Sequence, residues 1–218
     1  MKRVLVLAAA ALATTAFAAG ESIKHVNGAI DVAAGQQAGD LTTVNGSIEV
    51  GAGAKVGSIK TVNGGQTLGE GATASSMTTV NGAITLAKTA HVAGDLRSVN
   101  GGLTLHTGAE VTGALTNVNG TITIDAAHVV GVITTVGGNI SVLNGARVDG
   151  GILMKAQSGF SISFMYTVPR IVIGAGSSVA GPLTFEREVK LYVSDHAKSV
   201  GKITGATPIK FTGATPPG

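Results

Sequence analysis

The tripeptide Val-Asn-Gly recurs along the first two thirds of this chain. Six copies begin at Val26, Val44, Val62, Val80, Val99 and Val118, and a seventh, weakened to Val-Gly-Gly, begins at Val136. The starting positions of consecutive copies therefore follow a nearly constant period of 18 or 19. A fixed period this short is typical of a solenoid, in which each repeat forms one coil and stacks on the coil before it.

Each repeat also carries the same apolar pattern. When the Val of Val-Asn-Gly is position zero, positions 4 and 6 are apolar in nearly every coil, as at Ile48 and Val50, and the residue between them is polar. Position 12 gives a further apolar column, for which we expect Ala38, Val56, Ala74, Val92, Val111, Val130 and Val148. Short apolar–polar–apolar segments predict strands with one buried face. We therefore expect an all-β chain: a parallel β-solenoid of 18–19-residue coils with three short strands per coil.

The regularity divides the chain into four parts, the first of which is the N-terminal segment 1–18 described below. We expect regular coils over residues 19–155, because the period fails after Gly150. Residues 156–204 should form degenerate coils and an irregular C-terminal cap, since 171–183 and 191–203 repeat the pattern of 140–152. The tail, residues 205–218, repeats Gly-Ala-Thr-Pro and is expected to be disordered.

The Asn of the repeat predicts a structural ladder. If the coils stack in register, one column contains Asn27, Asn45, Asn63, Asn81, Asn100 and Asn119. Stacked amides can hydrogen-bond to one another along such a column. The Gly that follows each Asn suits a tight corner. The alternative is a column of Asn side chains that binds a ligand.

The N-terminal segment 1–18 has the pattern of a secretory signal peptide. Lys2 and Arg3 precede an apolar run over residues 4–13, and small residues at positions 16 and 18 form a cleavage site. The run is too short to span a membrane, and we expect cleavage after Ala18. The alternative is a retained membrane anchor. The prediction is an exported protein, in the periplasm, at the cell surface or outside the cell, with no transmembrane segment in the mature chain.

Charge and cysteine content do not indicate a nucleic-acid-binding protein or a disulfide-stabilised one. The chain has 15 Lys and Arg against 12 Asp and Glu, and removal of segment 1–18, which contains Lys2 and Arg3, lowers the net charge from +3 to +1. The basic residues are scattered, which does not indicate a nucleic-acid partner. The chain has no cysteine, so no disulfide can form.

The polar residues do not predict an active site or a cofactor. The five histidines, which occupy different coil positions without metal-ligand spacing, are His25, His91, His106, His128 and His196. His128 falls at a position that other coils fill with Ala, which predicts an inward-facing side chain. Asp31 and Glu49 stack on neighbouring coils, which favours an exposed edge rather than an acid/base pair. Thr is common two residues before the repeated Val and five residues after it, but charged residues such as Lys60 and Glu49 interrupt both columns, which disfavours an ice-binding face. We expect a protein that is not an enzyme, with no cofactor and no metal.

Aromatic residues gather after the regular repeat. Beyond Ala18 they are Phe160, Phe164, Tyr166, Phe185, Tyr192 and Phe211. A cap over the end of the stack is the favoured interpretation. The alternative is a ligand or partner surface, because exposed aromatics often anchor partners, and its candidates are Phe160, Phe164, Tyr166 and Tyr192.

The coils resemble two families of bacterial solenoids. The sequence VNGSIEVGAGAKVGSIKT is similar to coils of bacterial envelope adhesin domains, and GAEVTGAL and GARVDGGI resemble coils of bactofilins, which polymerise inside the cell. The signal peptide departs from the bactofilin pattern and favours the adhesin branch. The hypothesis is a secreted, non-enzymatic structural or adhesin-like β-solenoid of the bacterial envelope. Its partner would be a cell-surface glycan or envelope component. One alternative is a β-helix that binds or cleaves polysaccharide, and another is a bactofilin-like polymer, a homo-oligomer formed through the solenoid ends.

Overall fold

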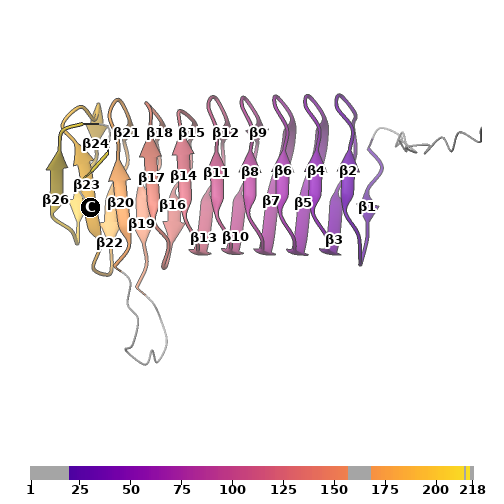
Figure 1. Cartoon of the computed structure of the whole chain (residues 1–218), viewed down its shortest axis with the longest axis horizontal. Helices are drawn as coiled ribbons and strands as arrows, with labels where there is room; N and C mark the ends of the chain where they lie inside the picture. Colours follow the sequence, from indigo (N-terminus) through magenta and orange to yellow (C-terminus); the bar gives the residue numbers. More distant parts are fainter. Residues whose placement is uncertain (1–19, 157–167, 214, 217–218) are drawn as a thin grey trace, which may run out of the picture.

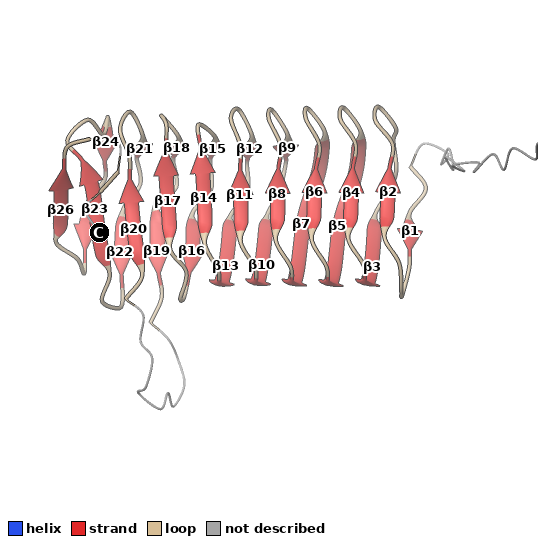
Figure 2. Cartoon of the chain, viewed as in Figure 1, coloured by secondary structure: helices blue, strands red, loops and turns tan. Residues whose placement is uncertain are grey.

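The chain folds as a parallel β-solenoid, as the repeat predicts. The computed structural model describes residues 20–156, 168–213 and 215–216. All strand pairs among these residues are parallel, and the coils lie side by side along the long axis (Figure 1). The described residues contain strands and loops but no helix (Figure 2), so this part of the chain has no helix that could cross a membrane.

One long face of the solenoid is a ten-stranded sheet, here called sheet B. It contributes one strand per coil, and each strand pairs with the next in register, as in Ile84↔Leu103 and Leu86↔Leu105. Its strands are β2 (Ile30–Val32), β4 (Ile48–Val50), β6 (Gln66–Leu68), β8 (Ile84–Leu86), β11 (Leu103–Leu105), β14 (Ile122–Asp125), β17 (Ile140–Leu143), β20 (Arg170–Ile173), β23 (Lys190–Ser194) and β26 (Pro208–Phe211). Positions 4 and 6 of the repeat face inward along this sheet.

The remaining strands form a sixteen-stranded sheet, sheet A, which divides into two columns beyond β7. The column that ends near the Val-Asn-Gly corner contains β1 (Ile23–Lys24), β3 (Leu41–Asn45), β5 (Lys55–Asn63), β7 (Thr73–Asn81), β10 (Leu96–Asn100), β13 (Leu115–Asn119), β16 (Ile133–Thr135), β19 (Ile152–Met154), β22 (Leu183–Phe185) and β25 (Ile203–Thr204). The other column contains β9 (His91–Val92), β12 (Glu110–Val111), β15 (His128–Val129), β18 (Arg147–Val148), β21 (Ser178–Val179) and β24 (Ser199–Val200).

The split in sheet A has a local cause. In β5 and β7 the two inward residues that flank the bend, such as Val56 and Ile59, are three positions apart, and one strand runs through both columns. In the next five coils, from Val92 and Leu96 to Val179 and Leu183, they are four positions apart. The additional residue interrupts the strand, so each of these five coils has the predicted three strands, while the inward side chains keep their columns.

One prediction about the core is wrong. Val129, not Val130, occupies the inward column: it is fully buried and pairs with Val111 and Val148. The turn between Ile124 and the inward Ala127 has two residues, whereas the corresponding turns of the other regular coils have three. Because of this deletion, the following residues, up to Val129, each take the place that counting from Val118 gives to the next residue. The four-residue spacing between Val129 and Ile133 then returns Ile133 to its expected column.

The stack continues beyond the position where the sequence repeat fails. Ile140 pairs with Ile171, which in turn pairs with Leu191, so the irregular part of the sequence is an insertion between consecutive coils. Residues 157–167, within this insertion, lie outside the described residues. The expectation of a disordered tail is wrong for 208–211, because this segment forms β26 and pairs with β23.

The C-terminal coil ends the core with residues that do not suit further stacking. Pro208 and Lys210 pair with Leu191 and Val193, so they occupy the two inward positions of sheet B in its last strand. Proline has no N–H to donate to another strand, and a lysine at an inward position opposes apolar contact with another coil.

Candidate functional site

The Val-Asn-Gly corner forms a continuous ladder of amide hydrogen bonds. In each step, the Nδ2 of one Asn donates to the Oδ1 of the Asn in the preceding coil. The distances are 2.9 Å from Asn45 to Asn27, 2.8 Å from Asn63 to Asn45, 2.9 Å from Asn81 to Asn63, 3.0 Å from Asn100 to Asn81 and 3.1 Å from Asn119 to Asn100. All six side chains are exposed along one edge of the solenoid.

A second, buried column at this corner was not foreseen from the sequence. In the second to the sixth copy of the repeat, the residue before the Val points inward, and its side chain donates to the carbonyl oxygen of the corner glycine in the preceding coil. These bonds run from Thr43 to Gly28, Thr61 to Gly46, Thr79 to Gly64, Ser98 to Gly82 and Asn117 to Gly101, at 2.8–3.3 Å. The sequence did contain a signal for this column. The position is polar in all these coils, although the strand alternation places it on the inward face. The column satisfies backbone carbonyls that the corner leaves without strand partners.

The corner glycines are needed for close contact between coils. A Cβ on Gly46, Gly64, Gly82 or Gly101 would lie well under 3.0 Å from the carbonyl oxygen of the corner glycine in the preceding coil. Only some of these residues have a positive φ, such as Gly64 at +159°, so turn conformation is not their shared requirement. The sequence pattern therefore specifies how closely the coils approach one another.

Two aspartates tie neighbouring coils together at the bend in sheet A. The Asp40 carboxylate accepts hydrogen bonds from the backbone N–H of Ser58 (2.7 Å) and from its hydroxyl (2.8 Å). These bonds, the backbone one first, hold the pKa of Asp40 below its ordinary value. Asp95 accepts from Arg97 at 2.6 Å and from the backbone N–H of Ala114 at 2.9 Å, and these bonds lower its pKa in the same way.

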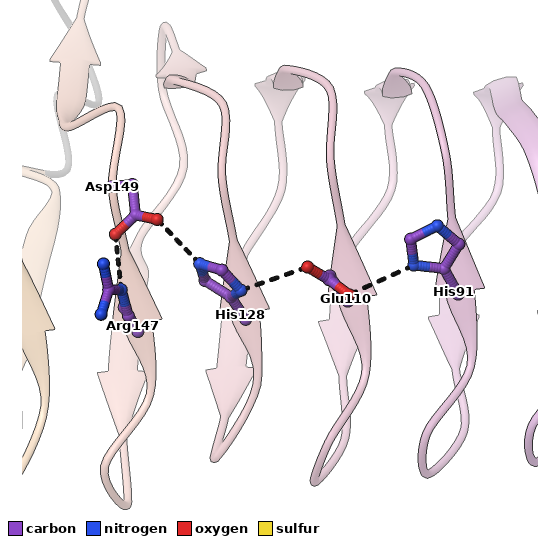
Figure 3. Close-up of polar contacts among 5 residues, drawn as sticks. All are labelled: His91, Glu110, His128, Arg147 and Asp149. Atoms are coloured by element: carbon purple, nitrogen blue, oxygen red, sulfur yellow. Dashed lines mark hydrogen bonds and ion pairs between the residues drawn. The ribbon is translucent and has the colours of Figure 1, made fainter.

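Basic and acidic side chains alternate in a row on the outer face of sheet A (Figure 3). His91 Nδ1 lies 3.4 Å from one oxygen of Glu110, and His128 Nδ1 lies 3.3 Å from the other. The Nε2 of His128 lies 2.9 Å from Asp149, which also accepts from Arg147 Nε at 2.6 Å. The four neighbouring strands β9, β12, β15 and β18, with the residue after β18, supply these side chains. We call these five residues the His–acid row.

Two expectations about the histidines are wrong. His128 does not face inward: Ala127 fills the inward position, and His128 pairs in register with Glu110 and Arg147. The deletion in the preceding turn moves His128 into the column of His91. The expectation that the histidines lie at unrelated coil positions therefore fails for this pair.

The chemistry of the His–acid row suits ion pairing. The hydrogen bonds from Arg147 and then from His128 hold the pKa of Asp149 below its ordinary value. The five side chains are 28–63% exposed, which screens their charges, and ion pairs of this kind contribute about 0–1 kcal/mol each. Within residues 20–156, 168–213 and 215–216, no three His, Asp or Glu side chains converge as metal ligands. The row is linear: His91 lies beside one carboxylate, that of Glu110, and His128 lies between two, those of Glu110 and Asp149.

Among the aromatic candidates, only Tyr192 lies in the described part of the chain. Phe160, Phe164 and Tyr166 lie outside it. Tyr192 is 5% exposed and packs with Val172 and Phe211 on the outer side of sheet B. The Arg170 guanidinium lies 4.5 Å from the centroid of its ring. The expectation of an exposed aromatic anchor is therefore wrong for Tyr192, because the last strand carries Phe211 over it.

The fold places the chain among parallel β-solenoid proteins. No protein-family model, curated protein or solved structure matches it. The likeness to envelope adhesin domains and to bactofilins consequently rests on the coil motifs alone.

Proposed function

We propose that this protein is an exported, non-catalytic rod of the bacterial envelope with a structural or adhesin-like role. The observation that carries the proposal is the use of the repeated residues. The Asn ladder, the buried polar column before the Val residues and the corner glycines all join one coil to the next. Repetition of the tripeptide through six coils therefore serves the stack, as in a scaffold. Export is proposed from the signal-peptide pattern of segment 1–18.

Fractionation of cells that express the full chain tests the location. We expect the protein in the periplasm, envelope or medium, with an N-terminus at Ala19. Ala18→Arg, which replaces the small residue before the proposed cleavage site, should prevent cleavage. Recovery of uncleaved wild-type protein only in the cytoplasm would refute the proposal.

The adhesin-like role is supported by a line of exposed valines beside the Asn ladder. Isolated exposed apolar residues are normal on a protein surface. Here, however, consecutive coils expose the same residue: Val26 is 67% exposed, and Val44, Val62, Val80 and Val99 are 37–40% exposed. This line presents a repeated apolar contact along one edge of the rod.

A binding assay on isolated bacterial envelope fragments tests the adhesive surface. A variant with Val44, Val62 and Val80 replaced by Thr keeps the shape of the side chains and removes apolar contact. We expect it to bind the fragments more weakly than the wild type. The matched control replaces Thr67, Thr85 and Thr104 on sheet B by Ser and should bind normally. Equal binding by both variants would exclude the valine line as the adhesive surface.

The alternatives receive less support. A polysaccharide-binding role would need exposed aromatic anchors, and Tyr192 is buried. A polymer built through the solenoid ends would need a C-terminal coil that accepts another coil, whereas Pro208 and Lys210 occupy its inward positions. Light scattering of the mature protein distinguishes the cases: concentration-dependent growth of long particles would favour the polymer.

A further inference from the structure

We infer that Asn119 and Asn144 are sites of spontaneous deamidation, and that the five earlier Asn–Gly pairs of the ladder are protected from this modification. Asn is among the thermolabile residues. When Gly follows it, the Gly backbone nitrogen can attack the Asn side chain with little steric hindrance. The chain contains seven Asn–Gly pairs, whose Asn residues are Asn27, Asn45, Asn63, Asn81, Asn100, Asn119 and Asn144.

The reaction depends on the Gly nitrogen. The backbone nitrogen of Gly loses its proton and attacks Asn Cγ, a C–N bond closes a succinimide ring, and ammonia leaves with the former amide nitrogen. Water then opens the ring at one of its two carbonyls and gives Asp or isoaspartate. No oxidant or other reactant is required. A Gly N–H that donates to a fixed acceptor must give up that bond before it can react, which slows the first step.

Five of the seven pairs have this protection. Their Gly N–H donates to the backbone oxygen of the Asn in the next coil: Gly28 to Asn45, Gly46 to Asn63, Gly64 to Asn81, Gly82 to Asn100 and Gly101 to Asn119, at 2.9–3.1 Å. In each of these pairs the Asn Oδ1 also accepts from the Nδ2 of the next coil. Both reacting groups are therefore held by the ladder.

Asn119 stands where the ladder ends. The next coil has Gly137 at the ladder position, which offers no amide side chain. Among the described residues, nothing donates to Asn119 Oδ1, and the N–H of Gly120 has no backbone acceptor. The exposed side chain keeps only its bond to Asn100.

Asn144 lacks the same protection in a different turn. It has a positive φ of 56°, and within the described part of the chain the N–H of Gly145 has no backbone acceptor. Its side-chain amide donates to Asp125, so only the leaving group is held.

Conversion at Asn119 would shorten the ladder. An aspartate at this position has no amide N–H to donate to Asn100 Oδ1. Isoaspartate also adds a carbon to the main chain beside Gly120, where a Cβ would already meet the carbonyl of Gly101.

Peptide mass spectrometry of aged protein tests the inference. The folded mature protein is incubated at mildly alkaline pH and sampled over time, and digestion reports the acid and isoaspartate fraction at each Asn. We expect conversion at Asn119 and Asn144 to be at least tenfold faster than at the other five. A sample unfolded in urea is the control, and there all seven should convert at similar rates.

A second variant separates ladder protection from other causes. Gly137→Asn extends the ladder by one residue and should slow conversion at Asn119 without changing Asn144. Folding of the variant is checked by its circular dichroism. Conversion of any of the five ladder residues as fast as Asn119, or no conversion at either Asn119 or Asn144 while the unfolded control reacts, would overturn the inference.

Discussion

Replacement of the corner glycine Gly82 should disrupt the solenoid far more than replacement of Gly65, a glycine of the preceding coil that has room for a Cβ. In Gly82→Ala the new Cβ would lie well under 3.0 Å from the carbonyl oxygen of Gly64 in the preceding coil. That oxygen belongs to the backbone of a packed coil and cannot rotate away. The two coils must therefore separate at this corner.

The hydrogen bonds beside the clash set the size of the effect. Separation stretches the bond from Gly64 N to Asn81 O (3.0 Å), the amide bond from Asn81 to Asn63 (2.9 Å) and the bond from Thr79 Oγ1 to Gly64 O (3.2 Å). A hydrogen bond contributes about 1 kcal/mol net to stability. Loss of all three costs about 3 kcal/mol, which lies at the upper end of the usual range for overpacking.

Gly65→Ala is the matched control in the same coil as Gly64. A Cβ at Gly65 would lie 3.5 Å from the carbonyl oxygen of Ala83, an ordinary contact, and the next coil already carries an Ala at this position. The change in the free energy of unfolding should stay within about 0.5 kcal/mol.

Urea denaturation followed by circular dichroism measures both variants. With an m value of about 2 kcal/mol/M, Gly82→Ala should lower the unfolding midpoint by about 1.5 M. Because repeat proteins can unfold in parts, hydrogen exchange at the amides around Gly64 should show whether the loss is local. Equal midpoints for the two alanine variants would refute the contact argument for the corner glycines.

Three further predictions concern the ladder, the acid range and the cap. Asn81→Ala removes two amide hydrogen bonds and should cost about 2 kcal/mol, whereas Asn27→Ala removes one and should cost about 1 kcal/mol; equal urea midpoints would contradict this. The lowered pKa of Asp40 contributes stability that is full above the ordinary carboxyl pKa of about 4 and is lost as the pH falls through the lowered value. Asp40→Asn should therefore reduce the drop in urea midpoint below pH 4, and an unchanged acid profile would exclude the Ser58 contact as a source of acid sensitivity. Phe211→Ala removes a buried ring from the cap and should cost about 3 kcal/mol locally, so the C-terminal end should be cleaved faster by an added protease; an unchanged cleavage rate would count against the packing role.

The fold could be predicted because its determinants are local and repeated. Residues such as Ile48 and Val50 flank a polar residue, and the same alternation recurs from coil to coil and specifies strands with one buried face. The period then specifies stacking, because each coil can bury its inward face only together with its neighbours. The Asn column follows from the same register.

The His–acid row could not be predicted because it depends on a single deletion. Counting from Val118 places His128 at the inward position of its coil, while the shortened turn after Ile124 moves it to the outer face. Sequence alone gives no reason to place the missing residue in this turn rather than elsewhere in the coil. The apolar core decides, because Ala127 and Val129 fit the inward columns and leave His128 facing solvent.

The sequence by itself determined the solenoid, its period, most of its apolar columns and the corner at which the Asn side chains stack. These features follow from contacts between equivalent residues one coil apart, and the period alone specifies such contacts. The tertiary structure decided which polar residues meet on sheet A, that β26 covers Tyr192, and that the N–H of Gly120 has no backbone acceptor among the described residues. Those outcomes depend on where single coils depart from the repeat, and the packing of the whole stack resolves such departures.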